Sequence, residues 1–203
     1  MNDLKVVAFD CDGVMFDSAE ANRAYYNSIL RHFGRPDMTE EQFAYGHMST
    51  GDETIASLFP EPEIFEKVQA YRRTIGYFEF IRFMKMEPHL KAQLKRLRLT
   101  YKTAIATNRT DTLNRVLEEH DLKQHFDFIV SARDVAHPKP HPEQLFRILD
   151  HFQIQPGQAI YIGDSQVDQQ ASNAAAVPFI AFNNPSLTAD FHIQSLRDLD
   201  DIV

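Results

Sequence analysis

Short apolar runs recur along the chain and alternate with segments of helical periodicity. Five runs have the length and composition of buried strands, at residues 4–9, 103–106, 126–130, 159–162 and 178–182. From residue 88 onward the intervening segments carry apolar residues at helical spacing, over 90–99, 110–120, 142–152 and 166–176. Strands that alternate with helices predict parallel βαβ units, and therefore an α/β fold with a doubly wound, Rossmann-like parallel sheet.

The stretch between the first two runs has a different character. Helices are expected over 18–33, after a capping box that begins at Thr39, after Gly51, and over 62–85. Aromatic residues are concentrated here, because 13 of the 23 Phe and Tyr residues lie between Phe16 and Phe83. We therefore expect a helical cap subdomain at residues 15–86, inserted into an α/β core of residues 1–14 and 87–203.

Composition narrows the class of protein. The chain has 203 residues and a formal net charge of −8. Its hydrophobic and charged fractions, 43% and 25%, exclude a disordered chain. No window approaches the roughly 18 apolar residues of a membrane span, and the first residues do not resemble a cleavable signal. The acidic balance argues against nucleic acid as a partner. A single cysteine excludes an internal disulfide and suits the cytoplasm.

Polar side chains gather just after the predicted strands. The residues concerned are Asp10, Asp12, Thr107, Asn108, Lys139, Asp164 and Asp168. Because the carboxyl ends of parallel strands open on one edge of a sheet, we expect these side chains to share a cleft. Clustered carboxylates repel one another and favour a bound divalent cation, whereas the hydroxyl, ammonium and loop N–H groups suit a phosphate.

This combination is typical of Mg²⁺-dependent phosphoryl transfer. One carboxylate can attack phosphorus to form an aspartyl-phosphate, and a second can donate and then accept a proton. The cluster also accounts for part of the acidity, since Lys139 and one Mg²⁺ would reduce four negative charges to about one.

Other chemically active residues have simpler interpretations. His137 and His141 lie in a proline-interrupted segment, which predicts a rigid turn rather than a metal site. Cys11 lies between the two aspartates and is expected to pack in the core. Arg109 and Arg133 are expected to be ordinary surface charges.

Four segments together carry a resemblance to a known family. They are Val6–Val14, Ile105–Asn108, Pro138–Pro140 with Pro142, and Ile162–Asp168. Their order and spacing resemble the haloacid-dehalogenase-like hydrolase superfamily, in the branch with a helical cap that includes phosphoglycolate-phosphatase-like and β-phosphoglucomutase-like proteins. The resemblance covers essentially the whole chain.

The resemblance implies a role for each strand-end residue. Asp10 would be the nucleophile and a Mg²⁺ ligand, and Asp12 the general acid and base, with its backbone carbonyl as a further ligand. Thr107, with Asn108 beside it, would bind the transferring phosphate, and Lys139 would neutralise the phosphate and the nucleophile.

Two more aspartates complete the implied metal site, with Asp164 as a ligand and Asp168 in support of the metal or its waters. A carboxylate at position 12 favours phosphate chemistry, because the dehalogenases of the superfamily lack one there. The favoured function is a phosphatase that acts on a small phosphorylated metabolite, in a monomer or homodimer.

Two alternatives remain open. A sugar-phosphate mutase would return the phosphoryl group to the substrate, and His47, within the expected cap loop 46–53, is the one candidate for its cap acid/base. A receiver-type signalling module also combines acidic residues, a threonine and a lysine on a doubly wound sheet, but it has no inserted cap.

Overall fold

The computed structural model describes residues 3–48, 51–110 and 112–203, and the chain divides into two compact units. The larger contains Met1–Asp17 and Lys85–Val203, and the helical unit contains Ser18–Met84. The helical unit is slightly shorter than the expected range 15–86. The reason is that β2 (Phe16–Asp17) pairs antiparallel with β3 (Lys85–Met86) and so ties both connections to the larger unit.

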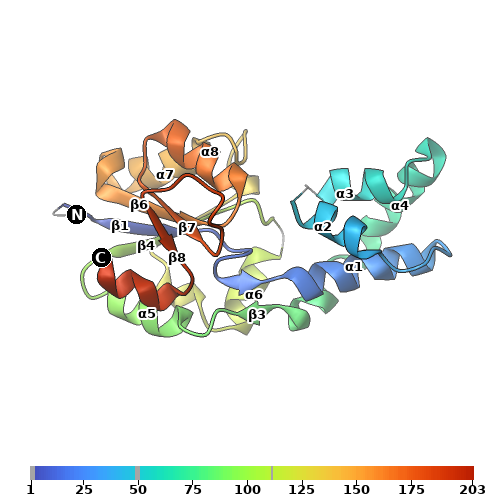
Figure 1. The fold of residues 1–203 in the computed structure, drawn as a ribbon, viewed down its shortest axis with the longest axis horizontal. Helices are drawn as coiled ribbons and strands as arrows, with labels where there is room; N and C mark the ends of the chain where they lie inside the picture. The colour runs from blue at the N-terminus through green and yellow to red at the C-terminus, as the bar shows by residue number, and fades with distance from the viewer. Residues whose placement is uncertain (1–2, 49–50, 111) are drawn as a thin grey trace. The chain divides into compact units, whose positions relative to one another are not determined.

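A six-stranded sheet forms the centre of the larger unit (Figure 1). Its strands are β1 (Val6–Phe9), β4 (Lys102–Thr107), β5 (Phe128–Ser131), β6 (Ala159–Gly163), β7 (Phe179–Phe182) and β8 (Phe191–Ile193). The order is β5-β4-β1-β6-β7-β8 and every pairing is parallel. The predicted doubly wound α/β fold is confirmed. Of the six strands of this sheet, β8 was the one not predicted, since it is three residues long and largely exposed.

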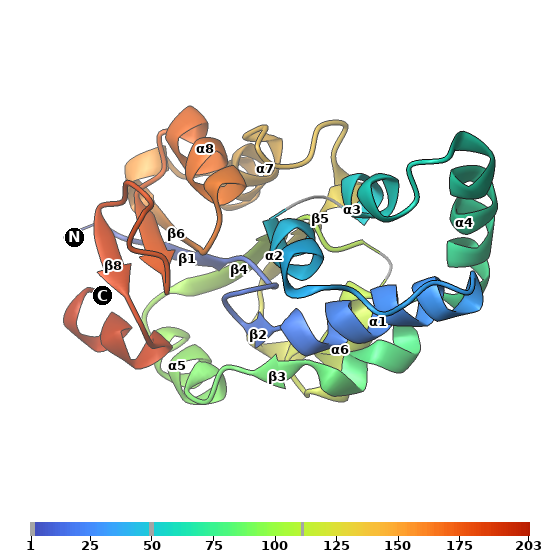
Figure 2. The same ribbon diagram turned by 45° about the vertical axis from the view of Figure 1, so that its right-hand side comes forward.

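Helices cover both faces of this sheet. They are α5 (Leu90–Leu97), α6 (Leu113–Glu119), α7 (Glu143–Phe152) and α8 (Gln166–Ala175), with short 3₁₀ turns η2 (Lys123–His125), η3 (Ala132–Asp134), η4 (Pro156–Gln158) and η5 (Leu196–Asp201). Figures 1 and 2 show α7 and α8 on one face and α5 with η5 on the other. Val6 and Ala8 pack into the core cluster that includes Leu145 and Ile148 of α7. Alternation directs their neighbours to the opposite face.

The helical unit contains α1 (Ala19–His32), α2 (Glu40–Met48), α3 (Gly51–Leu58), α4 (Pro62–Ile75) and the 3₁₀ turn η1 (Phe78–Phe83). The predicted capping box is present, because the Thr39 N–H donates to Gln42 Oε1 at 2.9 Å and the Gln42 N–H donates to Thr39 Oγ1 at 3.2 Å. The single helix expected over 62–85 is wrong. It ends before Gly76, whose φ of +58° is left-handed and open mainly to glycine.

Aromatic side chains build this unit's own core. Tyr25 contacts the rings of Tyr26, Tyr77 and Phe80, and Phe59 is fully buried. The segment 46–53, expected as a loop, is mostly the end of α2 and the start of α3. Residues 49–50 and the side chain of His47 lie outside the described part of the chain.

In the described part of the chain, every helix is too short or too polar to traverse a lipid bilayer.

Candidate active site

The carboxyl ends of three adjacent central strands meet at one edge of the sheet. Asp10 follows β1, Thr107 ends β4 and Asp164 follows β6. The parallel register aligns Phe9 with Ile162, and the Asp10 N–H donates to the Ile162 carbonyl at 2.9 Å, so the pairing continues into the aspartate. The strand ends are therefore held by the same hydrogen bonds that build the sheet.

Lys139 is the buried centre of the site. Its Nζ lies 2.8 Å from Asp10 Oδ1, 2.6 Å from Asp168 Oδ1, 2.7 Å from the Tyr161 hydroxyl and 3.1 Å from the Ala106 carbonyl. Burial alone would lower the pKa of Lys139, but the two carboxylates outweigh it and hold this pKa above its usual value. Lys139 is therefore a fixed positive charge beside Asp10.

Asp168 is saturated by hydrogen bonds. Oδ1 accepts from Lys139 and from the Tyr161 hydroxyl, at 2.6 and 2.8 Å, and Oδ2 accepts from the backbone N–H and the hydroxyl of Ser165. Burial opposes ionisation, but Lys139 and these donors lower the pKa of Asp168. The residue caps α8 and anchors Lys139. Sequence reasoning missed Tyr161, because a tyrosine in a buried strand looks like an ordinary core residue.

Three carboxylates lie close enough to share a cation. One oxygen each of Asp10, Asp164 and Asp168 lies within 4.8 Å of the others. Burial, reinforced by Asp168, raises the pKa of Asp10 to about 7 despite the attraction of Lys139. Burial and the repulsion of Asp10 and Asp168 raise the pKa of Asp164 to about 8. Lys139 alone therefore leaves negative charge in excess, and the residues fit a divalent cation.

Glycine is required where the loop after β1 approaches Asp164. Gly13 has a φ of +82°, and a Cβ there would lie 2.0 Å from Asp164 Oδ2. A side chain at this position would therefore collide with the carboxylate and strain the backbone. The close approach places backbone from the Asp10–Gly13 loop beside the acidic cluster.

Asp12 faces a different partner. Its carboxylate accepts two hydrogen bonds from Arg109, at 2.6 and 2.9 Å, and it is not among the three clustered carboxylates. The Arg109 side chain is 6% exposed and also donates to the Thr112 hydroxyl at 2.7 Å. The expectation of an ordinary surface charge at Arg109 is wrong. Only the tertiary structure pairs two residues that are 97 positions apart.

Thr107 and Asn108 link the site to the Lys139 loop. The Thr107 hydroxyl oxygen accepts the Arg109 N–H at 3.1 Å, which leaves its own O–H to donate to a ligand. The Asn108 amide bridges to the backbone of Lys139, donating to its carbonyl at 2.9 Å and accepting its N–H at 3.0 Å. The side chain of Asn108 thus holds the loop, and its predicted contact with phosphate stays a prediction.

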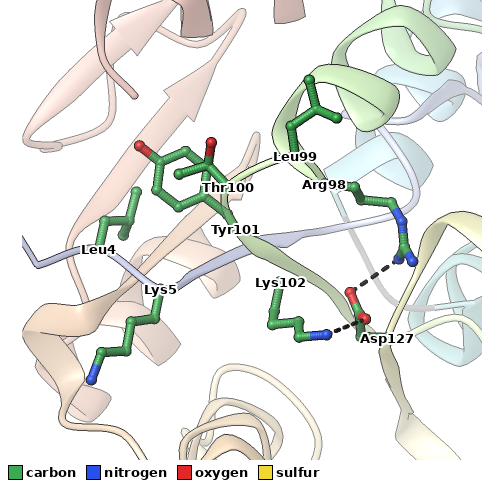
Figure 3. Close-up of a pocket in the computed structure, with 8 residues that line it drawn as sticks. All are labelled: Leu4, Lys5, Arg98, Leu99, Thr100, Tyr101, Lys102 and Asp127. Carbon is green, nitrogen blue, oxygen red and sulfur yellow. Dashed lines mark hydrogen bonds and ion pairs between the residues drawn. The ribbon is translucent and has the colours of Figure 1, made fainter.

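A surface hollow of about 370 Å³ lies elsewhere on the larger unit (Figure 3). It is lined by Leu4, Lys5, Arg98, Leu99, Thr100, Tyr101, Lys102 and Asp127. Lys5 and Tyr101 immediately precede β1 and β4, so the hollow opens at the amino ends of the strands, opposite the aspartates. Arg98 and Lys102 both pair with Asp127, at 3.0 and 3.1 Å, and these pairs neutralise part of the positive charge of the hollow.

Comparison with known proteins agrees with this geometry. Residues 7–182 match the family described as haloacid dehalogenase-like hydrolase. A phosphoglycolate phosphatase of Vibrio vulnificus (strain CMCP6) is 26% identical, over 99% of this chain and 96% of the relative. The crystal structure of a subfamily IA hydrolase of the same superfamily from Geobacter sulfurreducens PCA is 38% identical, with a TM-score of 0.87 over 98% of this chain and 96% of the other.

A β-phosphoglucomutase from Clostridium difficile has the same fold, with a TM-score of 0.79 at 18% identity, over 97% of this chain and 93% of that one. The two aspartates that follow β1, the buried contacts of Lys139 and the family match together identify a hydrolase with an α/β fold. The chain belongs to the haloacid dehalogenase-like hydrolases. The family match and the phosphatase relatives confirm the expected enzyme class, a phosphoric monoester hydrolase, and speak against the receiver-type module.

Proposed function

We propose that the protein is a Mg²⁺-dependent phosphatase that hydrolyses a small phosphorylated metabolite through an aspartyl-phosphate on Asp10. The observation that carries the proposal is the contact of Asp10 Oδ1 with the buried Lys139 ammonium, 2.8 Å away, beside two further carboxylates. A carboxylate with a fixed cation next to it can approach an anionic phosphoryl group that would otherwise repel it.

The residues that would hold Mg²⁺ are Asp10, Asp164 and the backbone carbonyl of Asp12, with Asp168 behind them. The excess negative charge of the cluster supports this assignment, because burial and mutual repulsion raise the pKa of both Asp10 and Asp164. The ion would supply charge neutralisation for the phosphate oxygens. The hydrogen bonds of Asp168 to Lys139 and Ser165 suit a supporting role.

The chain's own residues carry the reaction in two steps. A carboxylate oxygen of Asp10 attacks phosphorus, the new O–P bond forms, and the ester O–P bond breaks while Asp12 gives a proton to the leaving oxygen. Water then attacks the acyl phosphate, and Asp12 accepts its proton as Asp10 is released. The Thr107 O–H donates to a phosphate oxygen, and the Lys139 ammonium, held at Asp10 and Asp168, neutralises the phosphate and the nucleophile. Asn108 keeps the Lys139 loop in place.

Residues 15–86 would act as a cap that selects the substrate and excludes water. The relatives' name suggests 2-phosphoglycolate as the first compound to test. A mutase would require an acid/base from this cap. The likeness to a β-phosphoglucomutase is one of fold alone, so we favour hydrolysis.

Phosphate release from an aryl phosphate, with and without Mg²⁺ and EDTA, tests the proposal. Asp10→Asn should abolish turnover with the fold intact by circular dichroism, whereas Asp150→Asn, an exposed aspartate on α7, should retain it. Turnover by Asp10→Asn, or full wild-type activity in EDTA, would refute the nucleophile or the metal assignment respectively. A screen of phosphorylated metabolites, read by phosphate release and by sugar-phosphate isomer analysis, then separates phosphatase from mutase.

A further inference from the structure

The loop that carries Lys139 presents a second cluster of ligand atoms on its outer side. His137, His141 and Glu143 each offer one atom, and these three atoms lie within 4.8 Å of one another. Both histidines are exposed and the glutamate is partly buried. We propose that this cluster is a binding site for a transition-metal ion of the Zn²⁺ type, separate from the acidic Mg²⁺ site and independent of the proposed function.

The backbone brings the two histidines together. Residues 137–143 read His-Pro-Lys-Pro-His-Pro-Glu, and the His141 N–H donates to the Pro138 carbonyl at 3.1 Å, which closes a turn. The two imidazole rings consequently lie with centroids 4.8 Å apart. Each proline fixes its own φ, so the turn holds the two imidazoles at little further cost in conformational entropy. The rigid turn predicted from the sequence is therefore what assembles the cluster.

Glu143 is held over the turn as the third ligand. Its carboxylate accepts the backbone N–H groups of Ala136 and His137, both at 3.0 Å, and lies 3.3 Å from His137 Nδ1. These backbone donors, with His137, lower the pKa of Glu143 and keep it ionised. The Glu143 N–H reaches His141 Nδ1 only at 3.3 Å, beyond the usual range of about 2.7–3.2 Å, so this imidazole is not tightly tethered and can turn toward an ion.

The distances are those of a site close to its bound form. Ligands about 2.0–2.1 Å from a tetrahedral Zn²⁺ lie about 3.3 Å from one another, which is the separation already present between His137 and Glu143. No pair of the three ligand atoms is more than 4.8 Å apart, so closing the widest gap requires a movement of at most about 1.5 Å, within reach of exposed side chains.

Ligand chemistry distinguishes the two clusters. Imidazole nitrogen suits Zn²⁺, Co²⁺, Ni²⁺ and Cu²⁺, whereas an all-carboxylate group suits Mg²⁺. Two neutral imidazoles and one carboxylate would leave a bound divalent ion with a net charge of about +1, completed by water. The Lys139 ammonium takes no part, because it is committed to Asp10 and Asp168 on the buried side of the loop.

Isothermal titration of the full chain with ZnCl₂, in the presence of excess Mg²⁺ to occupy the acidic cluster, tests the site. We expect the variant His137→Ala with His141→Ala to bind one equivalent of Zn²⁺ fewer than the wild type, and either single variant to bind it at least about tenfold more weakly. His192→Ala, an exposed histidine on β8, is the matched control and should bind as the wild type does.

A second measurement separates the two clusters. Asp164→Asn should keep the equivalent of Zn²⁺ that the double histidine variant loses. Absorption bands of bound Co²⁺ should likewise persist in Asp164→Asn and vanish in the double variant. The histidine variants change exposed positions, so their melting temperatures without metal should match the wild type. Any of three results overturns the proposal. The wild type and the double variant bind Zn²⁺ with equal stoichiometry, neither binds Zn²⁺, or Asp164→Asn also loses the equivalent.

Discussion

Removal of Mg²⁺ should make the stability of this protein fall as the pH rises through neutrality. The folded state holds a proton on Asp10 up to about pH 7, because burial raises its pKa, whereas the unfolded chain releases that proton near pH 3.8. Between those values the folded state binds more protons than the unfolded state, so the free energy of unfolding decreases with increasing pH. Asp164, with a pKa of about 8, acts in the same direction.

The size of the effect follows from the shift. For Asp10 an increase of about 3 pKa units corresponds to about 4 kcal/mol at about 1.36 kcal/mol per unit. In a chain of this length that corresponds to a melting temperature lower by an amount on the order of 10 °C. Mg²⁺ binds the ionised carboxylates, so added Mg²⁺ should restore stability more strongly at about pH 8.5 than at about pH 5.

Thermal unfolding in EDTA and in millimolar Mg²⁺, across this pH range, is the assay. Asp10→Asn removes the ionisable group, so in EDTA at about pH 8.5 it should melt above the wild type. Asp150→Asn, an exposed position on α7, is the control and should melt with the wild type. The reasoning is refuted if the wild-type melting temperature in EDTA does not fall between about pH 5 and pH 8.5, or if Asp10→Asn gives no stabilisation there.

Three further substitutions test the site. Lys139→Met leaves two buried carboxylates without their cation and should lower the free energy of unfolding at neutral pH by about 3–5 kcal/mol. Urea unfolding measures this change, and a variant as stable as the wild type would contradict it. Arg109→Ala removes the two hydrogen bonds that position the Asp12 carboxylate, so it should lower kcat at least about tenfold with little change in KM. The loss should be largest for alkyl phosphates, because their leaving oxygen needs a proton. Arg109→Lys should restore part of the activity. Gly13→Ala should abolish stabilisation by Mg²⁺ in thermal-shift titrations, whereas Gly157→Ala, where a Cβ meets open space, should not.

Local patterns were sufficient for most of the fold. Short apolar runs with little polar character predicted five of the six sheet strands, because a strand buried on both faces must be apolar throughout. The capping box at Thr39 was equally readable, since it depends on residues three positions apart. Prediction failed at Gly76, where one backbone conformation ends α4 inside an apolar helical pattern, and at β8, which is too short to give a signal.

The sequence by itself determined which residues stand after each strand, and therefore that carboxylates, a hydroxyl and a lysine would meet at one sheet edge. This followed because parallel strands all end on the same side. Tertiary structure alone decided the pairings. It brought Arg109 to Asp12 across 97 positions and placed the Tyr161 hydroxyl against Lys139. Such contacts depend on packing between segments that are far apart in the chain. No periodic pattern in the sequence indicates which of these segments meet.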